Sequence, residues 1–221
     1  DAYKSGELPP ELDIVRLYPA GADGERVVNA TQVNRLNPLI PEDYFKAQVK
    51  LRNQIHTVMQ FLKNNVEGFE NIRIKDSSDI VGVRESRRIV GQYTLTAEDL
   101  IAGRRFEDAI VHKADFAIDI HNPDGAGQAE SDTIPVRIGN YDIPYRCIVP
   151  LKNRNLYTAG RCISGTHRAH ASYRVMNIAM NLGEAAGVVA AVCIRENSDN
   201  KAVGYKKVQT ALAERGIDLF E

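Results

Sequence analysis

Several residue types and signatures are missing or scarce in this sequence. It has no tryptophan, and its three cysteines, Cys147, Cys162 and Cys193, form no CxxC pair. An odd number of cysteines is not a disulfide framework, and mostly apolar neighbours lead us to expect buried, reduced thiols. There is no signal peptide and no run of about 18 apolar residues. The net charge of −1 creates no general attraction to nucleic acid or to an anionic membrane. The composition is therefore that of a globular protein whose partners depend on local sites.

A complete dinucleotide-binding turn is also missing. FAD and NAD enzymes with a Rossmann-type domain hold the pyrophosphate on a GxGxxG turn that opens a helix. The nearest approach, residues 125–130 (GAGQAE), has Glu130 at the third glycine position and lies in a polar loop. Residues 160–165 have the glycine spacing of a P-loop, but Thr166 stands where lysine is required. This difference excludes a nucleotide triphosphatase.

The patterns that are present predict a mixed α/β fold. The clearest element is a helix that begins at Pro41 and ends near Gly68, because one apolar stripe recurs at helical spacing. The stripe consists of Leu51, Ile55, Val58, Leu62 and Val66. Residues 96–99 (TAED) form a capping box for a short helix that ends near Gly103. Further helices are predicted at 174–195 and 202–215, and strands at 12–18, 26–33, 72–74, 80–83, 88–93, 109–120, 134–140, 141–150 and 155–159.

Residues 155–191 carry the strongest indication of a ligand site. A short strand ends in Gly160, a polar loop follows, and a helix rich in glycine and alanine begins near Arg174. Glycine allows a cofactor to approach the backbone closely, and the free amides at the helix start suit an anion or a polarised carbonyl. The segment therefore predicts a strand–loop–helix crossover with a ligand at the loop. Tight packing of the helix on a sheet, without a ligand, is the alternative.

Three motifs follow one another along the chain. The first comprises residues 82–91 (GVRESRRIVG) and 93–95, and the second comprises residues 141–146 (YDIPYR). The third consists of residues 159–164 (AGRCIS), Thr166, His167, Ala169, Ser172, residues 174–176 (RVM) and residues 183–187 (GEAAG). Together they resemble the C-terminal part of FAD-dependent oxidoreductases with the glutathione-reductase-type fold, over about residues 80–195. Asn177 replaces a proline that often follows Arg-Val-Met in that family.

The resemblance implies a set of site residues. It places the FAD against Ala159, Gly160, Arg161, Ser164, Val175, Met176 and Asn177. The candidate catalytic residues are His167, His170 and Arg174, because a histidine titrates near neutral pH and can serve as a general base or a substrate donor. Arg84 and Arg88, which would share one face of a strand, are candidates for binding an anionic substrate. No metal site is expected, because the two histidines have no third ligand nearby. A surface salt bridge for Arg161 and a loop-ordering role for either histidine are the alternatives.

The resemblance also implies a domain organisation. Residues 1–150 are expected to form part of a mostly antiparallel substrate (cap) domain, and residues 151–221 the C-terminal segment of the FAD-binding domain, with its last strand and helix. Because the chain begins without methionine in a polar stretch, we expect the GxGxxG segment upstream and leave localisation open. The expected partners are that upstream segment and a small-molecule substrate, and a homo-oligomer is left open.

The implied function is oxidation or reduction of a substrate by hydride transfer at the flavin. FAD is expected in the full-length protein and not in these residues alone. Two alternatives come from other classes of protein. One is a carbohydrate-active protein, because some members of the family carry polysaccharide-lyase labels, and the other is a non-catalytic binding module.

Overall fold

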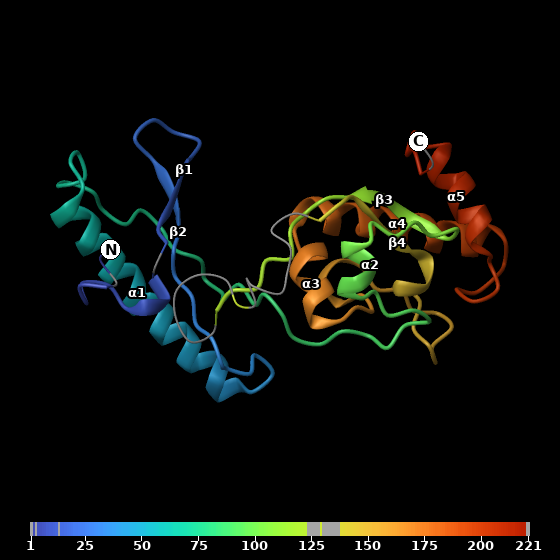
Figure 1. Cartoon of the computed structure of the whole chain (residues 1–221), viewed down its shortest axis with the longest axis horizontal. Coiled ribbons are helices and arrows are strands. Elements are labelled where there is room, and N and C mark those ends of the chain that lie inside the picture. Colours follow the sequence, from blue (N-terminus) through green and yellow to red (C-terminus); the bar gives the residue numbers. More distant parts are fainter. Residues whose placement is uncertain (1, 3, 13, 123–128, 130–137, 220–221) are drawn as a thin grey trace. The chain divides into compact units, whose positions relative to one another are not determined.

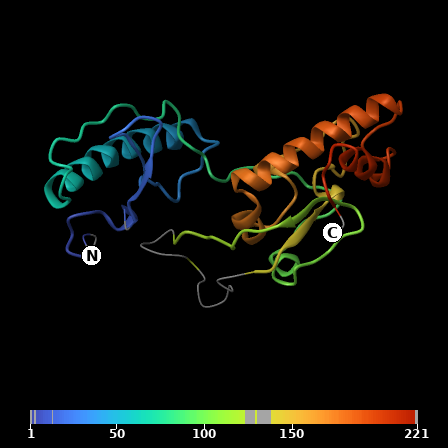
Figure 2. The ribbon, with the colours of Figure 1, turned by 90° about the horizontal axis from the view of Figure 1, so that it is seen from above.

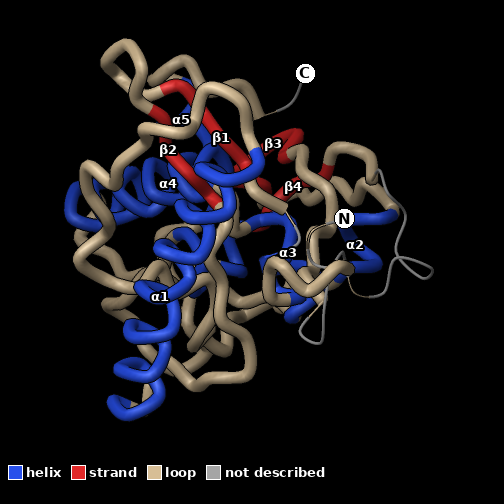
Figure 3. The backbone as a smooth tube through the Cα atoms, turned by 90° about the vertical axis from the view of Figure 1, so that its left-hand side faces the viewer, coloured by secondary structure: helices blue, strands red, loops and turns tan. Residues whose placement is uncertain are grey.

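The structure is a computed structural model that describes residues 2, 4–12, 14–122, 129 and 138–219. Within these residues, five α-helices and two antiparallel sheets of two strands each confirm the mixed α/β class. Long loops connect the helices and the short strands (Figure 3). Most of the 125–130 segment, and residues 134–137 of a predicted strand, lie outside the description.

The chain divides into two compact units. The first consists of Asp1–Ser86 and His121–Ala129, and the second of Arg87–Ile120 and Glu130–Glu221. This division differs from the boundary at residue 150 that the sequence suggested, because residues 87–120 pack into one unit with the C-terminal part of the chain. The assignment of the two parts to a substrate domain and an FAD domain stays a prediction.

The first unit contains one hairpin and one long helix. The strands β1 (Arg16–Pro19) and β2 (Arg26–Asn29) pair antiparallel, and α1 (Pro41–Asn65) follows them (Figure 1). α1 begins at proline, as predicted, and the acidic residues in its first turn complement the positive end of the helix dipole. Val58 and Leu62 of its apolar stripe are buried in a small core with other leucines.

The second unit is built around a short hairpin covered by helices. The strands β3 (Ala109–Ala114) and β4 (Tyr141–Pro144) pair antiparallel. The long helix α4 (Met176–Arg195) lies along β3, and α5 (Tyr205–Ala213) packs against both (Figure 2). The short helices α2 (Ala97–Ile101) and α3 (His167–Tyr173) contact each other in the same unit.

One face of α4 supplies a large share of the core of this unit. The buried residues recur at helical spacing: Ile178, Leu182, Ala185, Val189, Val192 and Cys193. Full burial of a valine, leucine or isoleucine side chain contributes roughly 1.5–3 kcal/mol to the stability of the fold. By length and composition alone, α4 is also apolar enough to cross a membrane, but a core helix passes the same test.

Four predicted strands are absent from the described structure. Residues 72–74, 80–83, 88–93 and 155–159 form no strand. Residues 88–93 contain one isolated bridge, between Gly91 and Pro150, and their amides donate to two different segments instead of forming one ladder. The pairing of this segment depends on distant parts of the chain, which its own composition does not reveal.

The predicted strand at 109–120 is shorter than expected. β3 ends at Ala114, its register with β4 shifts twice, and Lys113 has a left-handed φ of 50°. A non-glycine residue rarely adopts this conformation, so the strand is interrupted there.

Candidate functional site

The three family-like motifs meet in the second unit, apart from residues 82–86, which belong to the first. Residues 89–95 run between residues 146–151 and residues 162–166. The amides of Ile89 and Leu95 donate to Cys162 and Ser164, and those of Gln92 and Tyr93 donate to Val149 and Arg146, at 3.0–3.2 Å. The spatial meeting of motifs far apart in the sequence defines the candidate site.

Gly91 lies so close to Ser164 and Arg146 that a side chain would not fit at this position. A Cβ atom added to Gly91 would lie 2.7 Å from the Cβ of Ser164 and 3.0 Å from the carbonyl oxygen of Arg146. Ser164 is buried, and its hydroxyl lies 3.1 Å from that of Thr94. The Ser164 side chain therefore fixes the segments to each other, and its predicted contact with the flavin stays a prediction.

The glycine turn of the third motif lies against the long helix. Gly160 begins a 3₁₀ turn, Gly160–Cys162, with a left-handed φ of 68° that favours glycine. An added Cβ atom would lie 3.7 Å from the Cβ of Ala179 in the first turn of α4. Arg161 is exposed, and so is Cys162. The expectation of three buried thiols is therefore wrong for Cys162, whereas Cys147 and Cys193 are buried.

A short helix replaces the loop that was expected after this turn. The side chain of Thr166 accepts a hydrogen bond from the amide of Ala169 at 3.2 Å and so caps α3. His167 is exposed in the first turn, whereas His170 is buried, with its ring 5.4 Å from that of Tyr173 in an edge-on arrangement. The two predicted catalytic histidines thus stand in different environments.

Among the residues that the structure describes, no side chain caps the first turn of α4. Its N-cap, Val175, makes no side-chain hydrogen bond to the first turn, and Met176 and Asn177 are exposed. Free amides at the positive end of a 20-residue helix suit a negatively charged or polarised group. The residues that the resemblance assigned to the flavin therefore have a chemistry that fits the polar edge of its ring system.

Arg174, between α3 and α4, is held by an ion pair that sequence reasoning did not predict. Its Nη2 lies 2.8 Å from a carboxylate oxygen of Asp119 and 3.1 Å from the carbonyl oxygen of the same residue. The two side chains are mostly buried. The double contact fixes Arg174 directly before the uncapped turn, and its catalytic role stays a prediction.

The predicted pair of substrate-binding arginines is divided between the units. Arg84 is exposed in the first unit, and Arg88 is half-buried in the second. No strand covers these residues, so the inference that they share a strand face is wrong. Their role in substrate binding stays a prediction.

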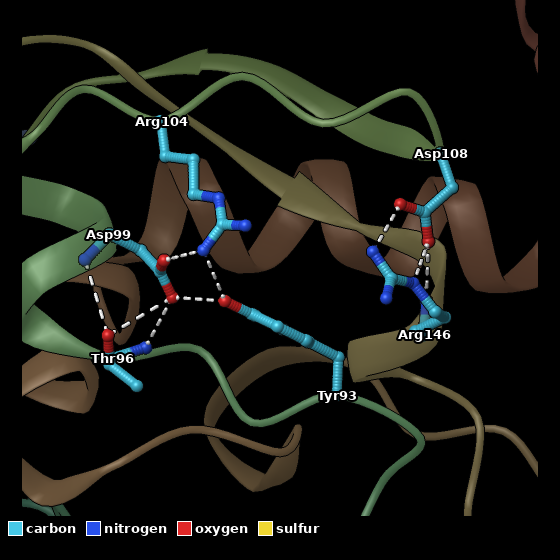
Figure 4. A network of polar contacts seen from close by, with 6 residues as sticks. All are labelled: Tyr93, Thr96, Asp99, Arg104, Asp108 and Arg146. Atoms are coloured by element: carbon cyan, nitrogen blue, oxygen red, sulfur yellow. Dashed lines mark hydrogen bonds and ion pairs between the residues drawn. The ribbon is translucent and has the colours of Figure 1, made fainter.

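A polar network surrounds Tyr93 (Figure 4). The Tyr93 hydroxyl donates to Asp99 at 2.7 Å and accepts from Arg104 at 3.1 Å. On Asp99, burial alone would raise the pKa, but hydrogen bonds from Tyr93, Arg104 and Thr96 together lower it. Burial and the hydrogen bond to Asp99 raise the pKa of Tyr93 to about 12, so this hydroxyl keeps its proton at neutral pH.

Sequence reasoning found only part of this network. The capping box, in which Thr96 and Asp99 bond reciprocally at the start of α2, was predicted from local spacing and is confirmed. The two arginines of the network were not predicted. Arg104 pairs with Asp99, five residues before it, and Arg146 pairs with Asp108, which lies 38 residues away in the sequence. Among the described residues, no group of three histidine, cysteine or acidic side chains could hold a metal ion.

The family described as FAD dependent oxidoreductase matches residues 3–212. No curated protein and no solved structure matches the chain. Because the match covers nearly the whole sequence, the chain belongs to the FAD-dependent oxidoreductase family.

Proposed function

We propose that this chain is the C-terminal part of a flavin enzyme that oxidises or reduces a small molecule by hydride transfer. The observation that carries the proposal is the position of the Gly160–Cys162 turn against the first turn of α4, whose amides have no side-chain cap. Bound FAD would supply the hydride chemistry, and the protein would supply orientation and charge. The full-length protein of this proposal is this chain together with the upstream FAD-binding segment that the proposal requires.

The residues would divide the work of holding the cofactor. Ala159, Gly160 and Arg161 would contact the ribityl or pyrophosphate region, because a glycine turn leaves room for a close approach. The amides of Val175 to Asn177 would face the pyrimidine edge, where reduced flavin carries negative charge. An interaction of this kind with a helix terminus is worth roughly 0.3–1 kcal/mol when exposed and about 2 kcal/mol when partly buried.

The upstream segment would cover the outer face of α4. Met176 and Met180 are 83% and 73% exposed, and Ile194 near the other end is 83% exposed. Gly183 and Gly187, between them, are also exposed and would permit a close approach of another backbone. Exposed apolar side chains along one helix are typical of a docking surface. We therefore infer that this face meets the rest of the FAD-binding domain.

Proton transfer to or from the substrate would fall to His167. A general acid or base must reach the substrate, and His167 is exposed at the start of α3, whereas His170 is buried. Arg174, fixed by Asp119, would orient the substrate or the flavin at the same junction. Arg84 and Arg88 would bind an anionic part of the substrate.

A pair of alanine variants of the full-length protein tests this proposal. His167→Ala should slow the reduction or reoxidation of bound flavin by substrate about 10²–10⁴-fold. Flavin content and thermal unfolding should stay unchanged. His170→Ala should instead leave a cavity and lower the free energy of unfolding by about 2 kcal/mol.

The measurements are stopped-flow absorbance of the flavin, with substrates taken from a compound screen, and thermal unfolding of each variant. If His170→Ala abolished the reaction and His167→Ala left its rate normal, proton transfer would be assigned to His170 instead of His167. A full-length holoprotein whose flavin no substrate reduces or reoxidises would contradict the oxidoreductase proposal itself.

A further inference from the structure

Two arginines are held against one tyrosine ring in the second unit. The Cζ atom of Arg146 lies 5.0 Å from the centroid of the Tyr93 ring, and the Cζ atom of Arg104 lies 5.9 Å from it. Figure 4 shows the Arg104 guanidinium at the hydroxyl end of Tyr93 and Arg146, paired with Asp108, nearer the Cα end of Tyr93. Both guanidinium groups therefore lie against the same ring, and among the described residues no acidic side chain pairs with both of them.

A separate buried carboxylate orients each guanidinium. Nη1 of Arg104 donates to Asp99 at 2.8 Å. Nε and Nη2 of Arg146 donate to the two oxygens of Asp108 at 2.8 and 3.0 Å. Both carboxylates are 5% exposed, whereas the arginine side chains are 53% and 43% exposed. The negative charge of each pair is thus buried, and its guanidinium group is partly exposed to solvent.

Part of each guanidinium remains available to a ligand. Within the described residues, Nε and Nη2 of Arg104 and Nη1 of Arg146 donate no hydrogen bond. The hydrogen bond to Asp99 raises the pKa of Arg104, and the neighbouring charge of Arg146 opposes this effect. An anion between the two groups would relieve that repulsion and engage donors that already have fixed positions.

We propose that Arg104 and Arg146 form a binding site for a small oxyanion, a carboxylate or a phosphate group, beside Tyr93. The planar guanidinium fork matches both groups, and the buried carboxylates prevent its rotation. No residue of this site belongs to the proposed flavin-binding segment, so the site can be tested without flavin.

Calorimetric titration of this chain with inorganic phosphate and, separately, with succinate at constant ionic strength tests the site. At least one probe should bind saturably with a stoichiometry of one. The double variant Arg104→Lys, Arg146→Lys keeps the charges beside Asp99 and Asp108 but loses the forks, and should bind about tenfold or more weakly. If it does not fold, each single lysine variant should still weaken binding.

Arg105→Lys is the matched control. Arg105 adjoins Arg104, has a side chain that is 49% exposed and pairs with the buried Asp142 at 2.7 Å, but faces no second arginine across a shared ring. The affinity of the Arg105→Lys variant for the probe should stay within about twofold of the affinity of the unmodified chain. Binding of phosphate alone would assign a phosphate-bearing ligand, and binding of succinate a carboxylate. Absence of saturable binding of both probes, or equal losses in the control and the double variant, would overturn the proposal.

Discussion

Gly160→Val is expected to abolish flavin retention in the full-length protein. Gly160 has a φ of 68°, a conformation that costs an ordinary residue roughly 1–2 kcal/mol and a β-branched residue more. The valine side chain would also project from the turn that lies against Ala179 of α4. It would therefore occupy the space along which the cofactor would pass.

The experiment compares the ratio of flavin to protein absorbance after purification. Gly216→Val is the matched control, because Gly216 has a similar φ of 82° and an added Cβ atom would meet nothing within 4 Å. Both variants carry the same backbone strain, so only Gly160→Val should lose the flavin. Equal flavin content in the two variants would contradict the assignment of the turn to the cofactor.

Asp142→Ala is expected to produce the largest loss of stability in the second unit. The carboxylate is nearly fully buried and hydrogen-bonds to Nη1 of Arg105 at 2.7 Å and Nδ1 of His112 at 2.9 Å. The amides of Phe106 and Lys113 also donate to it, each at 3.3 Å. Removing this acceptor leaves main-chain donors unpaired next to the irregular strand β3. The free energy of unfolding should fall by about 3 kcal/mol.

Urea unfolding of this chain measures the effect. Glu184→Ala is the control, because the pair between Glu184 and Arg215 at 2.9 Å is exposed and should contribute less than about 1 kcal/mol. Equal losses in the two variants would show that the buried carboxylate does not hold β3 and β4 in their observed register.

Local signals predicted the helices well. The start of α1 followed from proline and its course from an apolar stripe, and α2 followed from its capping box, because each signal depends on neighbours within one or two turns. The helix rich in glycine and alanine and the final helix were also predicted, and they are α4 and α5. The short helix α3 was missed, although Thr166 could have served as its capping signal. Its seven polar and small residues resemble a loop in composition.

Strands and site contacts were harder to predict. Residues 88–93 have a strand-like composition, but their partners lie more than 50 residues away, at Val149 and Cys162, and no local pattern encodes those pairings. The same limitation applies to Asp119, which holds Arg174, and to the arginines beside Tyr93. By contrast, the glycine turn at Gly160 and the small-residue helix after it were recognisable, because their chemistry is local.

Amide hydrogen exchange of the full-length protein, with and without added FAD, tests the central claim most directly. FAD should protect the amides of Gly160–Cys162 and of the first turn of α4 from Val175 onward, and should leave those of α5 unchanged. That result would place the cofactor at the junction that the fold creates between the glycine turn and the uncapped helix. Binding of FAD without any protection at these amides would contradict the account.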